Sequence, residues 1–190
     1  MIVGGAPLSP QLQALIGASL NVKLIQGYGA TELSGAVLCM DDNDMTYGNC
    51  GAPLSGIQIR LEDWQEGGYT AVDEPNPRGE LIVGGLGISK GYYNNQELTD
   101  NSYITDGTGM RWFRTGDIGE VFPDGTFKII DRKKDLIKLS NGEYFSLGKV
   151  CYLHKLKNST ELVYFTPRLR PALRIANMWK ISALLGTTPI

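Results

Sequence analysis

The sequence predicts an α/β fold in which a βαβ unit is followed by a small antiparallel, barrel-like sheet. Three observations support this: a helical pattern between two short apolar runs in residues 1–30, alternating apolar and polar residues from Ile57 to Glu62, and a Pro-Asp-Gly turn between apolar runs in residues 121–130. Glycine is abundant, at 24 of 190 residues, which favours turn-rich architecture over a helical bundle. The length of 190 residues fits one hydrophobic core or part of a larger protein.

Residues 1–30 are expected to form the βαβ unit. Ile2-Val3 is a short strand, and Ser9 caps a helix that has Pro10 at its first position. The apolar run Val22–Ile25 is expected to be a second, buried strand, and a right-handed parallel crossover is the default for such a unit. Four apolar residues of the helix recur at helical spacing and are expected to pack on the sheet: Leu12, Leu15, Ile16 and Leu20.

The segment QGYGATE, residues 26–32, follows the second apolar run, so we expect it at the carboxyl end of a strand, where open α/β sheets bind ligands. Its glycines allow a sharp turn and close approach to a ligand, and the Tyr28 ring offers a flat face to a purine. The Thr31 hydroxyl can bond a phosphate oxygen, and the Glu32 carboxylate can bind Mg²⁺. A strand, a Gly-rich turn and a helix cap would explain the same residues, so this segment alone leaves both interpretations open.

Three further segments carry candidate binding groups. The turn Gly4-Gly5-Ala6 ends the first strand on the same rim as Tyr28, where it forms either a slot for a planar group or simply a tight turn. Asp117 follows Thr-Gly at the edge of the antiparallel sheet, and its carboxylate either accepts from the two hydroxyls of a ribose or forms a turn. Arg132 lies in a charged segment that is typical of a solvated linker, and its planar fork suits sugar or phosphate oxygens.

Composition argues against several classes of protein. The chain is 42% apolar and 20% charged, with a formal net charge of −2, so nucleic acid is not an expected partner. No apolar run approaches the length of a membrane span, and the N-terminus lacks the pattern of a signal peptide. The three cysteines are widely spaced without a Cys-x-x-Cys pair, which favours reduced thiols in the cytosol over a zinc site.

A change of charge near Val150 predicts a boundary. Residues 151–190 carry six Lys or Arg and one acidic residue, whereas residues 1–150 carry 12 basic and 19 acidic residues. We favour an altered chain ending over a segment that binds RNA or anionic lipid. The predicted divisions are an α/β subdomain (1–50), an antiparallel β subdomain (51–131), a linker (132–150) and a divergent basic tail outside the fold (151–190).

Five motifs carry a resemblance to a known family, and they occur in the family's order and spacing: GGAPLSP, QGYGATE, RTGDIG, DRKKDLIK and NGEYFSLGKV. Together they resemble the adenylate-forming (AMP-binding) enzymes, and the sequences WQEGGY and NGEY are similar to the long-chain fatty acyl-CoA synthetase branch. The resemblance covers residues 1–150. It implies a partial adenylate-forming fold in which residues 132–150 are the hinge and the start of the C-terminal lid.

The resemblance also implies a reaction and its cofactors. Enzymes of this branch are ligases that convert a long-chain fatty acid, ATP and CoA to acyl-CoA, AMP and pyrophosphate through an acyl-adenylate, with Mg²⁺. The resemblance implies that a full-length member acts on the cytosolic face of the endoplasmic reticulum or on the mitochondrial outer membrane. Any attachment to the membrane would come through an upstream segment.

Particular residues receive roles by the same resemblance. Thr31, which contacts the phosphate, and Glu32, which ligates Mg²⁺, are the implied catalytic residues. The implied nucleotide-binding residues are Gly5 and Ala6 in the adenine and acyl pocket, Tyr28 stacked on adenine with Gly29 beside it, Thr31, and Asp117 with Arg132 on the ribose. The implied hinge residue is Lys134, and the implied CoA-channel residues are Lys138, Gly142 and Glu143.

The resemblance leaves three alternatives open. The first is a ligase of the same superfamily that acts on another carboxylate. The second is a non-catalytic regulator that binds an adenylate or acyl group. The third is a by-product that does not fold. The family's phosphate-binding loop is expected upstream of GGAPLSP, and its lid lysine is expected near the far C-terminus. Neither occurs in this sequence.

We therefore expect the purified 190-residue chain to show little or no ligase turnover, because it lacks the groups that stabilise the pyrophosphate leaving group. The measurement is ATP- and fatty-acid-dependent formation of the CoA thioester by the pure chain. Robust thioester formation would contradict this expectation.

Overall fold

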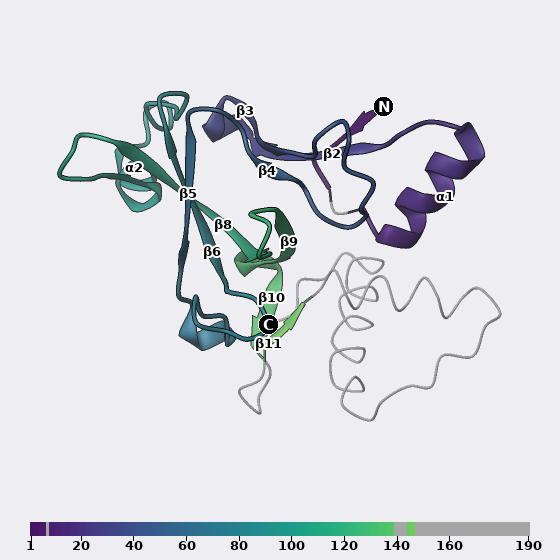
Figure 1. Ribbon diagram of the computed structural model, residues 1–190. Helices are drawn as coiled ribbons and strands as arrows, with labels where there is room; N and C mark the ends of the chain where they lie inside the picture. Colours follow the sequence, from purple (N-terminus) through teal and green to yellow (C-terminus); the bar gives the residue numbers. More distant parts are fainter. Residues whose placement is uncertain (7, 139–143, 147–190) are drawn as a thin grey trace, which may run out of the picture. The chain divides into compact units, whose positions relative to one another are not determined.

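The computed structural model describes residues 1–6, 8–138 and 144–146 (Figure 1). The chain forms two compact units, residues 1–130 and 131–190. Two of the CoA-channel residues implied by the resemblance, Gly142 and Glu143, lie outside the described residues. The predicted tail 151–190 also lies outside them. The predicted domain boundaries stay predictions.

The first unit begins with a four-stranded sheet and one helix. Strand β1 is parallel to β2, whereas β2, β3 and β4 are antiparallel neighbours, in the order β1-β2-β3-β4. The βαβ unit expected from the sequence is therefore present. Its elements and those that follow are β1 (Ile2–Val3), α1 (Pro10–Leu20), β2 (Ile25–Ala30), the 3₁₀ turn η1 (Thr31–Leu33), β3 (Gly35–Cys39) and β4 (Ala52–Pro53).

The ends of helix α1 follow the sequence prediction. The Ser9 side chain accepts a hydrogen bond from the backbone N–H of Leu12, and Pro10 occupies the first helical position. At the other end, Asn21 adopts a left-handed conformation with φ of 49°. The Asn21 N–H donates to the carbonyl of Gly17, which closes the last turn.

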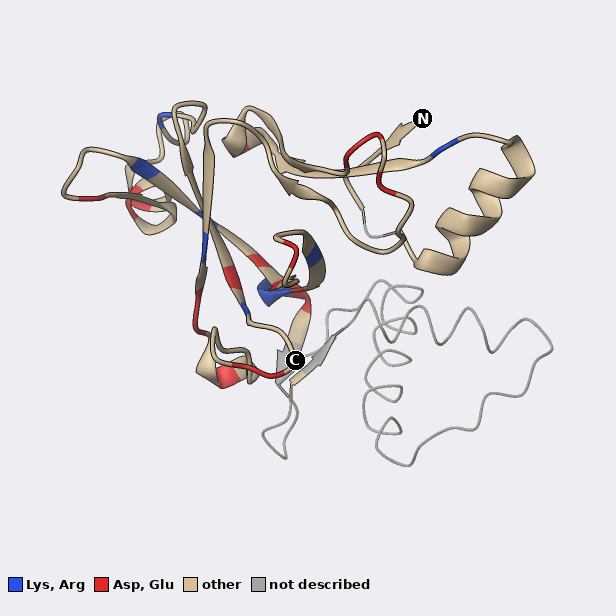
Figure 2. Ribbon diagram, in the orientation of Figure 1, with Lys and Arg blue, Asp and Glu red and all other residues tan. Residues whose placement is uncertain are grey.

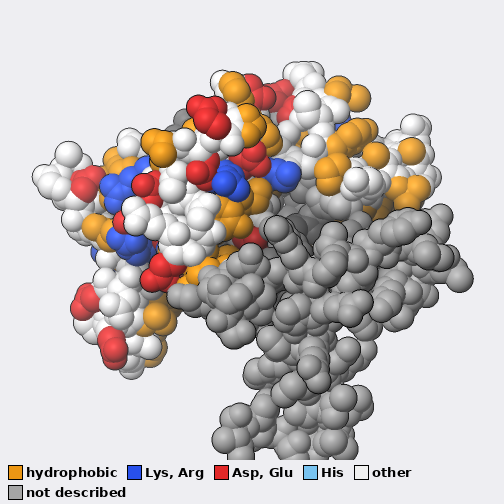
Figure 3. All heavy atoms as spheres, turned by 90° about the horizontal axis from the view of Figure 1, so that it is seen from below, with side chains coloured by type: hydrophobic (Ala, Val, Ile, Leu, Met, Phe, Trp, Pro, Cys, Tyr) orange, Lys and Arg blue, Asp and Glu red, His pale blue; other side chains and the backbone are white. Residues whose placement is uncertain are grey.

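The face of α1 that is buried differs from the prediction. Leu12, Leu15 and Leu20 are 45%, 61% and 59% exposed, whereas Gln13 is fully buried. The helix carries no Lys, Arg, Asp or Glu, as Figure 2 shows, and Figure 3 shows hydrophobic side chains at the surface on the side where α1 lies. The prediction that the apolar face packs on the sheet is wrong for these three leucines, because the buried position of the helix is taken by Gln13.

Buried hydrogen bonds explain this orientation of α1. Gln13 Nε2 donates to the Leu24 carbonyl at 3.3 Å, and Gln13 Oε1 accepts from Gln26 Nε2 at 2.7 Å. Gln13 Oε1 also accepts from the backbone N–H of Gly48 at 3.0 Å. The Gln13 amide therefore accepts from one buried and one half-buried donor and donates to one carbonyl. It joins the helix to β2 and to the loop after β3.

A second, five-stranded sheet follows. Its strand order is β5-β6-β8-β7, and β9 pairs with β8 outside this path. Strands β5 and β7 lie at opposite ends of the order, so the described strands form an open sheet and the expected barrel-like closure is not seen. The elements are β5 (Ile57–Glu62), η2 (Gln65–Gly67), β6 (Arg78–Gly85), α2 (Gln96–Ser102), β7 (Tyr103–Thr105), β8 (Arg111–Val121) and β9 (Phe127–Arg132).

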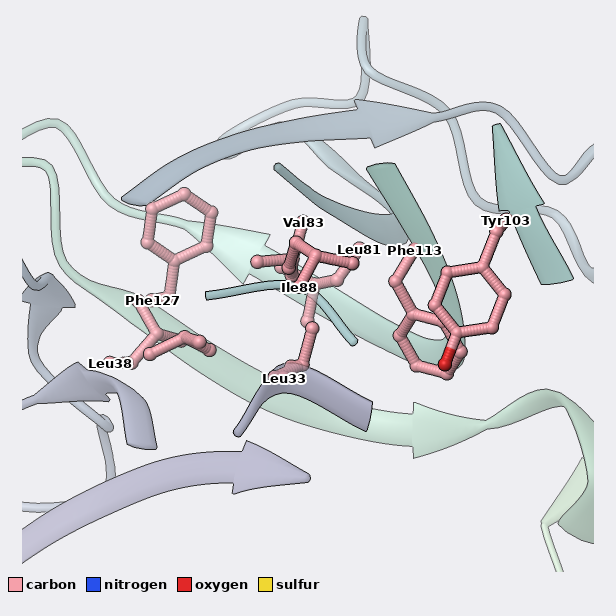
Figure 4. Close-up of a cluster of buried hydrophobic side chains, with 9 residues drawn as sticks. Leu33, Leu38, Leu81, Val83, Ile88, Tyr103, Phe113 and Phe127 are labelled. Atoms are coloured by element: carbon pink, nitrogen blue, oxygen red, sulfur yellow. The ribbon is translucent and has the colours of Figure 1, made fainter. Parts of the chain in front are cut away.

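The hydrophobic core lies between the two sheets of the first unit. Figure 4 shows side chains from η1, β3, β6, β7, β8 and β9 in one cluster. Tyr28 of β2 packs against this cluster, as do apolar residues of β5. The buried members are Leu33, Val37, Leu38, Leu81, Val83, Ile88, Tyr103, Phe113 and Phe127. The core therefore fixes the end of β2 against the β6–β8 sheet.

The second unit is described only in part. It contains the 3₁₀ turn η3 (Lys133–Asp135) and an antiparallel pair of strands, β10 (Leu136–Lys138) and β11 (Tyr144–Ser146). Leu136 pairs with Ser146 and Lys138 pairs with Tyr144.

Replacing Gln13 with leucine tests the buried anchor of α1. The Q13L variant leaves the Gln26 amide and the Gly48 N–H without their acceptor, so we expect it to lower the free energy of unfolding by about 1–3 kcal/mol. The matched control is Q11L on the exposed side of the same helix, which we expect to change stability by less than about 0.5 kcal/mol. Urea unfolding measures both. Equal midpoints for the two variants would show that the anchor does not stabilise the fold.

Candidate functional site

The segment QGYGATE lies within strand β2 and the turn that follows it. Residues 26–30 belong to the strand, and Thr31 begins η1. The expectation that the segment follows the strand is wrong, as is the expected sharp turn at its glycines, because neither Gly27 nor Gly29 has a positive φ. A Cβ at Gly29 would lie 2.0 Å from the Gly35 carbonyl oxygen, so the glycine is needed for close pairing of β2 with β3.

The predicted turn at residues 4–6 lies beside this strand. Val3 pairs with Gln26, and a Cβ at Gly4 would lie 2.9 Å from the carbonyl oxygen of Gly27. Gly5 follows with φ of 84°, and no atom lies within 4 Å of the position that a Cβ would take there. Gly5 and Ala6 are exposed. The two small-residue segments are therefore neighbours, as expected, while the binding role of Gly5 and Ala6 stays a prediction.

A hydrogen bond brings together two residues that the sequence separates by 89 positions. The Tyr28 hydroxyl of β2 donates to Asp117 Oδ2 of β8 at 2.6 Å. Both side chains are half-buried. The sequence analysis assigned Tyr28 to a base and Asp117 to a ribose separately. The structure places these two side chains at one site.

An irregularity in the second sheet places Asp117. The pairing of β6 with β8 shifts between Glu80 and Ile82, and Gly116 opposite the shift has φ of 71°. The Thr115 hydroxyl donates to the Leu81 carbonyl at 2.9 Å and accepts from the N–H of Asp117 at 3.0 Å. Thr-Gly-Asp is thus a bulge motif. The threonine ties it to β6, the glycine supplies the left-handed residue, and the aspartate accepts the hydrogen bond from Tyr28.

Glu80 supports the bulge and was not identified from the sequence. Its side chain is only 4% exposed, and its Oε1 accepts from the Gly116 N–H at 3.0 Å. The signal in the sequence was an acidic residue at the head of the apolar run Leu81–Val83. A carboxylate at that place is costly to bury unless it accepts hydrogen bonds, so its position indicated a nearby hydrogen-bond donor.

A second contact between residues far apart in the sequence holds Glu32. The Tyr92 hydroxyl donates to Glu32 Oε1 at 2.8 Å. Burial raises the pKa of Tyr92 to about 12, and the hydrogen bond to Glu32 adds to the effect. Tyr92 was not identified from the sequence, because nothing local links it to a residue 60 positions earlier. Thr31, at the start of η1, is exposed.

The remaining predicted residues belong to the second unit. Arg132 ends β9, Lys134 lies in η3, and Lys138 ends β10. The structure thus gathers Tyr28, Asp117 and Glu32 with their supporting residues in the first unit, and the roles predicted for the second unit stay predictions.

Known proteins share this sequence and fold. Residues 1–93 match the family of AMP-binding enzymes. Long chain acyl-CoA synthetase 8 of Arabidopsis thaliana is 50% identical over 150 residues, which cover 79% of this chain and 21% of the relative. Fatty acyl-CoA synthetase A of Dictyostelium discoideum is 40% identical over 144 residues, which cover 76% of this chain and 21% of the relative. The chain spans about a fifth of the length of these curated relatives.

Solved structures show the same fold. The A domain of carboxylic acid reductase from Segniliparus rugosus, in complex with AMP and a co-purified carboxylic acid, matches with a TM-score of 0.65 and 34% identity. That match covers 78% of this chain and 22% of the reductase domain. O-succinylbenzoate coenzyme A synthetase from Bacillus subtilis, in complex with ATP and magnesium ion, matches with a TM-score of 0.62 and 28% identity over 78% of this chain and 29% of the synthetase.

These findings confirm the family inferred from the motifs and the partial adenylate-forming fold. No helix in the part of the chain that the structure describes has the length and hydropathy required to span a bilayer. The names of two further Arabidopsis thaliana relatives, long chain acyl-CoA synthetases 6 and 7, include the word peroxisomal. Residues 1–93 belong to the family of AMP-binding enzymes, and the chain is similar to the long-chain acyl-CoA synthetases over about 150 residues.

Proposed function

We propose that this chain supplies part of the nucleotide site of a long-chain fatty acid–CoA ligase. The reaction would join a fatty acid to CoA with conversion of ATP to AMP and pyrophosphate through an acyl-adenylate. The names of the relatives support this substrate class, and the identity of 50% with one of them exceeds the 34% with the carboxylic acid reductase and the 28% with the O-succinylbenzoate coenzyme A synthetase. The observation that carries the proposal is the hydrogen bond from Tyr28 to Asp117.

That hydrogen bond suits recognition of adenosine. The Tyr28 ring would stack on the base, with Gly29 beside it and with Gly5 and Ala6 at the neighbouring turn. An ionised carboxylate offers about four acceptor positions, so Asp117 can accept from Tyr28 and from ribose hydroxyls together. Because the same hydrogen bond fixes the ring and the carboxylate, base and sugar would meet groups already placed for them.

Thr31 and Glu32 would act on the phosphates. The exposed Thr31 hydroxyl can donate to a phosphate oxygen, and the Glu32 carboxylate is a hard oxygen ligand suited to Mg²⁺. Among the described residues no group of three or more His, Cys, Asp or Glu side chains gathers. A Mg²⁺ at Glu32 would therefore take its other ligands from phosphate oxygens and water, as is usual for this ion. When bound, it would offset negative charge at the phosphates.

The second unit completes the proposal by resemblance. Arg132 would hold the ribose, and Lys134 would be the hinge of the lid. Lys138, Gly142 and Glu143 would line the channel for CoA. The proposed divisions remain 1–50, 51–131 and 132–150, followed by the tail 151–190. We propose the cytosolic face of the endoplasmic reticulum or the mitochondrial outer membrane as the location of the whole enzyme, and the names of two relatives make the peroxisome the alternative.

Removing the Asp117 carboxylate tests the proposed ribose contact. Calorimetry of the full chain would measure the affinity of the wild type and of D117A for ATP and for 2′,3′-dideoxy-ATP, each with Mg²⁺. Hydrogen bonds to a charged group contribute about 1.5–3 kcal/mol, so the wild type should prefer ATP by roughly tenfold or more, and D117A should lose most of that preference.

The matched control is D124A, in the exposed turn before β9, where Asp124 accepts only from Thr126 among the hydrogen bonds found here. It should keep the wild-type preference. A D117A variant that still discriminates between the two nucleotides as the wild type does would contradict the ribose assignment. A wild-type chain that binds neither nucleotide would contradict nucleotide binding by this chain.

A further inference from the structure

The loop between β6 and α2 holds the turn that carries Glu32. Ser34 Oγ donates to the Gly87 carbonyl at 2.6 Å, and the Ser89 N–H donates to the Glu32 carbonyl at 2.9 Å. The Tyr92 hydroxyl adds the contact to the Glu32 carboxylate at 2.8 Å. Two of these hydrogen bonds are made to Glu32 itself, one to its backbone and one to its side chain, and the third ties Ser34 of the same turn to the loop.

Tyr92 is itself held from two directions. Its backbone N–H donates to Thr99 Oγ1 of α2 at 2.9 Å, and its ring lies edge-on to Tyr103 with centroids 5.8 Å apart. Tyr103 belongs to the hydrophobic cluster in Figure 4, and its hydroxyl lies 2.6 Å from Ser89 Oγ of the same loop. Because these contacts already hold the Tyr92 side chain in place, its hydroxyl loses little conformational entropy when it bonds to Glu32.

The neighbouring tyrosine gives a contrast. Tyr93 is 93% exposed, whereas Tyr92 is half-buried and hydrogen-bonded. A tyrosine hydroxyl is a donor to a carboxylate, and a donor on one carboxylate oxygen fixes the direction of the other. This is the arrangement by which residues around a metal ligand orient that ligand.

We propose that Tyr92 is a positioning residue that orients the Glu32 carboxylate for Mg²⁺ bound with a nucleotide. The proposal rests on the proposed function, because it requires Glu32 to bind the ion. Tyr92 does not touch the ion or the nucleotide; it acts through one oxygen of Glu32. The loop at residues 86–95 is then part of the site, although none of the family motifs lies in this loop.

The test compares Y92F with Y93F in the full chain. Y92F removes one oxygen and keeps the ring that packs against Tyr103, whereas Y93F makes the same change at an exposed position. Calorimetric titration with ATP at a series of Mg²⁺ concentrations gives the apparent affinity for Mg²⁺ in the nucleotide complex. Loss of a partner that orients a metal ligand costs at least about tenfold in metal affinity, so Y92F should require about tenfold more Mg²⁺, and Y93F should match the wild type.

Two further variants separate this proposal from the proposed function. E32Q should weaken Mg²⁺ binding more than Y92F does, and the double variant Y92F/E32Q should be no weaker than E32Q alone, because Tyr92 acts through Glu32. If E32Q binds Mg²⁺ with ATP as the wild type does, the role proposed for Glu32 fails. If E32Q weakens binding but Y92F does not, the positioning role of Tyr92 fails and that of Glu32 stands.

A spectroscopic readout does not depend on nucleotide binding. The ¹³C signal of the Glu32 side-chain carboxyl should shift in Y92F and stay unchanged in Y93F, since among the described residues the hydrogen bond to that group comes from Tyr92. Unchanged Glu32 signals in a folded Y92F variant would overturn the proposal. If Y92F does not fold, S89A tests the same contact with Tyr92 intact. It removes the hydroxyl that contacts Tyr103, whose ring packs against Tyr92, so the Glu32 signal should shift; an unshifted signal in S89A would overturn the proposal.

Discussion

The hydrophobic contact between the two sheets of the first unit determines where the candidate site lies. Val37 and Leu38 of β3 are fully buried together with Leu81 and Val83 of β6, so the sheets cannot separate without exposing the core. Tyr28 packs at the edge of this cluster. The polar contacts between the sheets therefore form where the apolar contact has already set the spacing.

The candidate site is a set of polar contacts at this junction. Each contact joins a residue of the β2–η1 segment to a residue of the second sheet or its loops: Tyr28 to Asp117, and Glu32 to Tyr92. Both pairs consist of a phenol that donates and a carboxylate that accepts, and such charge-assisted hydrogen bonds are among the stronger ones in proteins. The site thus depends on the packing of the sheets, and it in turn ties them together.

Local sequence patterns predicted the parts of the fold that depend on neighbouring residues. The cap at Ser9, the parallel βαβ unit and the alternating strand at Ile57–Glu62 all follow from signals within a few positions. The family motifs also named Tyr28 and Asp117, which the structure places in contact. What the motifs could not supply was the hydrogen bond itself.

The residues that the sequence did not reveal act over long separations. Gln13, Glu80 and Tyr92 are polar residues whose side chains make the hydrogen bonds described above to groups at least 11 positions away, so no periodic pattern records them. The glycines of β2 show the same limit: their spacing suggested a turn toward a ligand, whereas Gly29 is required by the carbonyl of Gly35 on the paired strand. Helix α1 was oriented wrongly because apolar spacing outweighed one glutamine in the sequence pattern.

That glutamine links the anchoring of α1 to the candidate site. Gln13 bonds to the side chain of Gln26, and Gln26 lies two residues before Tyr28 on the same strand. The backbone N–H of Gln26 also donates to Met40 Sδ at 3.4 Å, so the start of the motif is fixed from the helix and from the residue after β3. Polar partners accept few geometries, whereas apolar packing tolerates sliding of a helix along a sheet. A buried amide pair at this place therefore sets the register of α1 and, through β2, the position from which Tyr28 reaches Asp117.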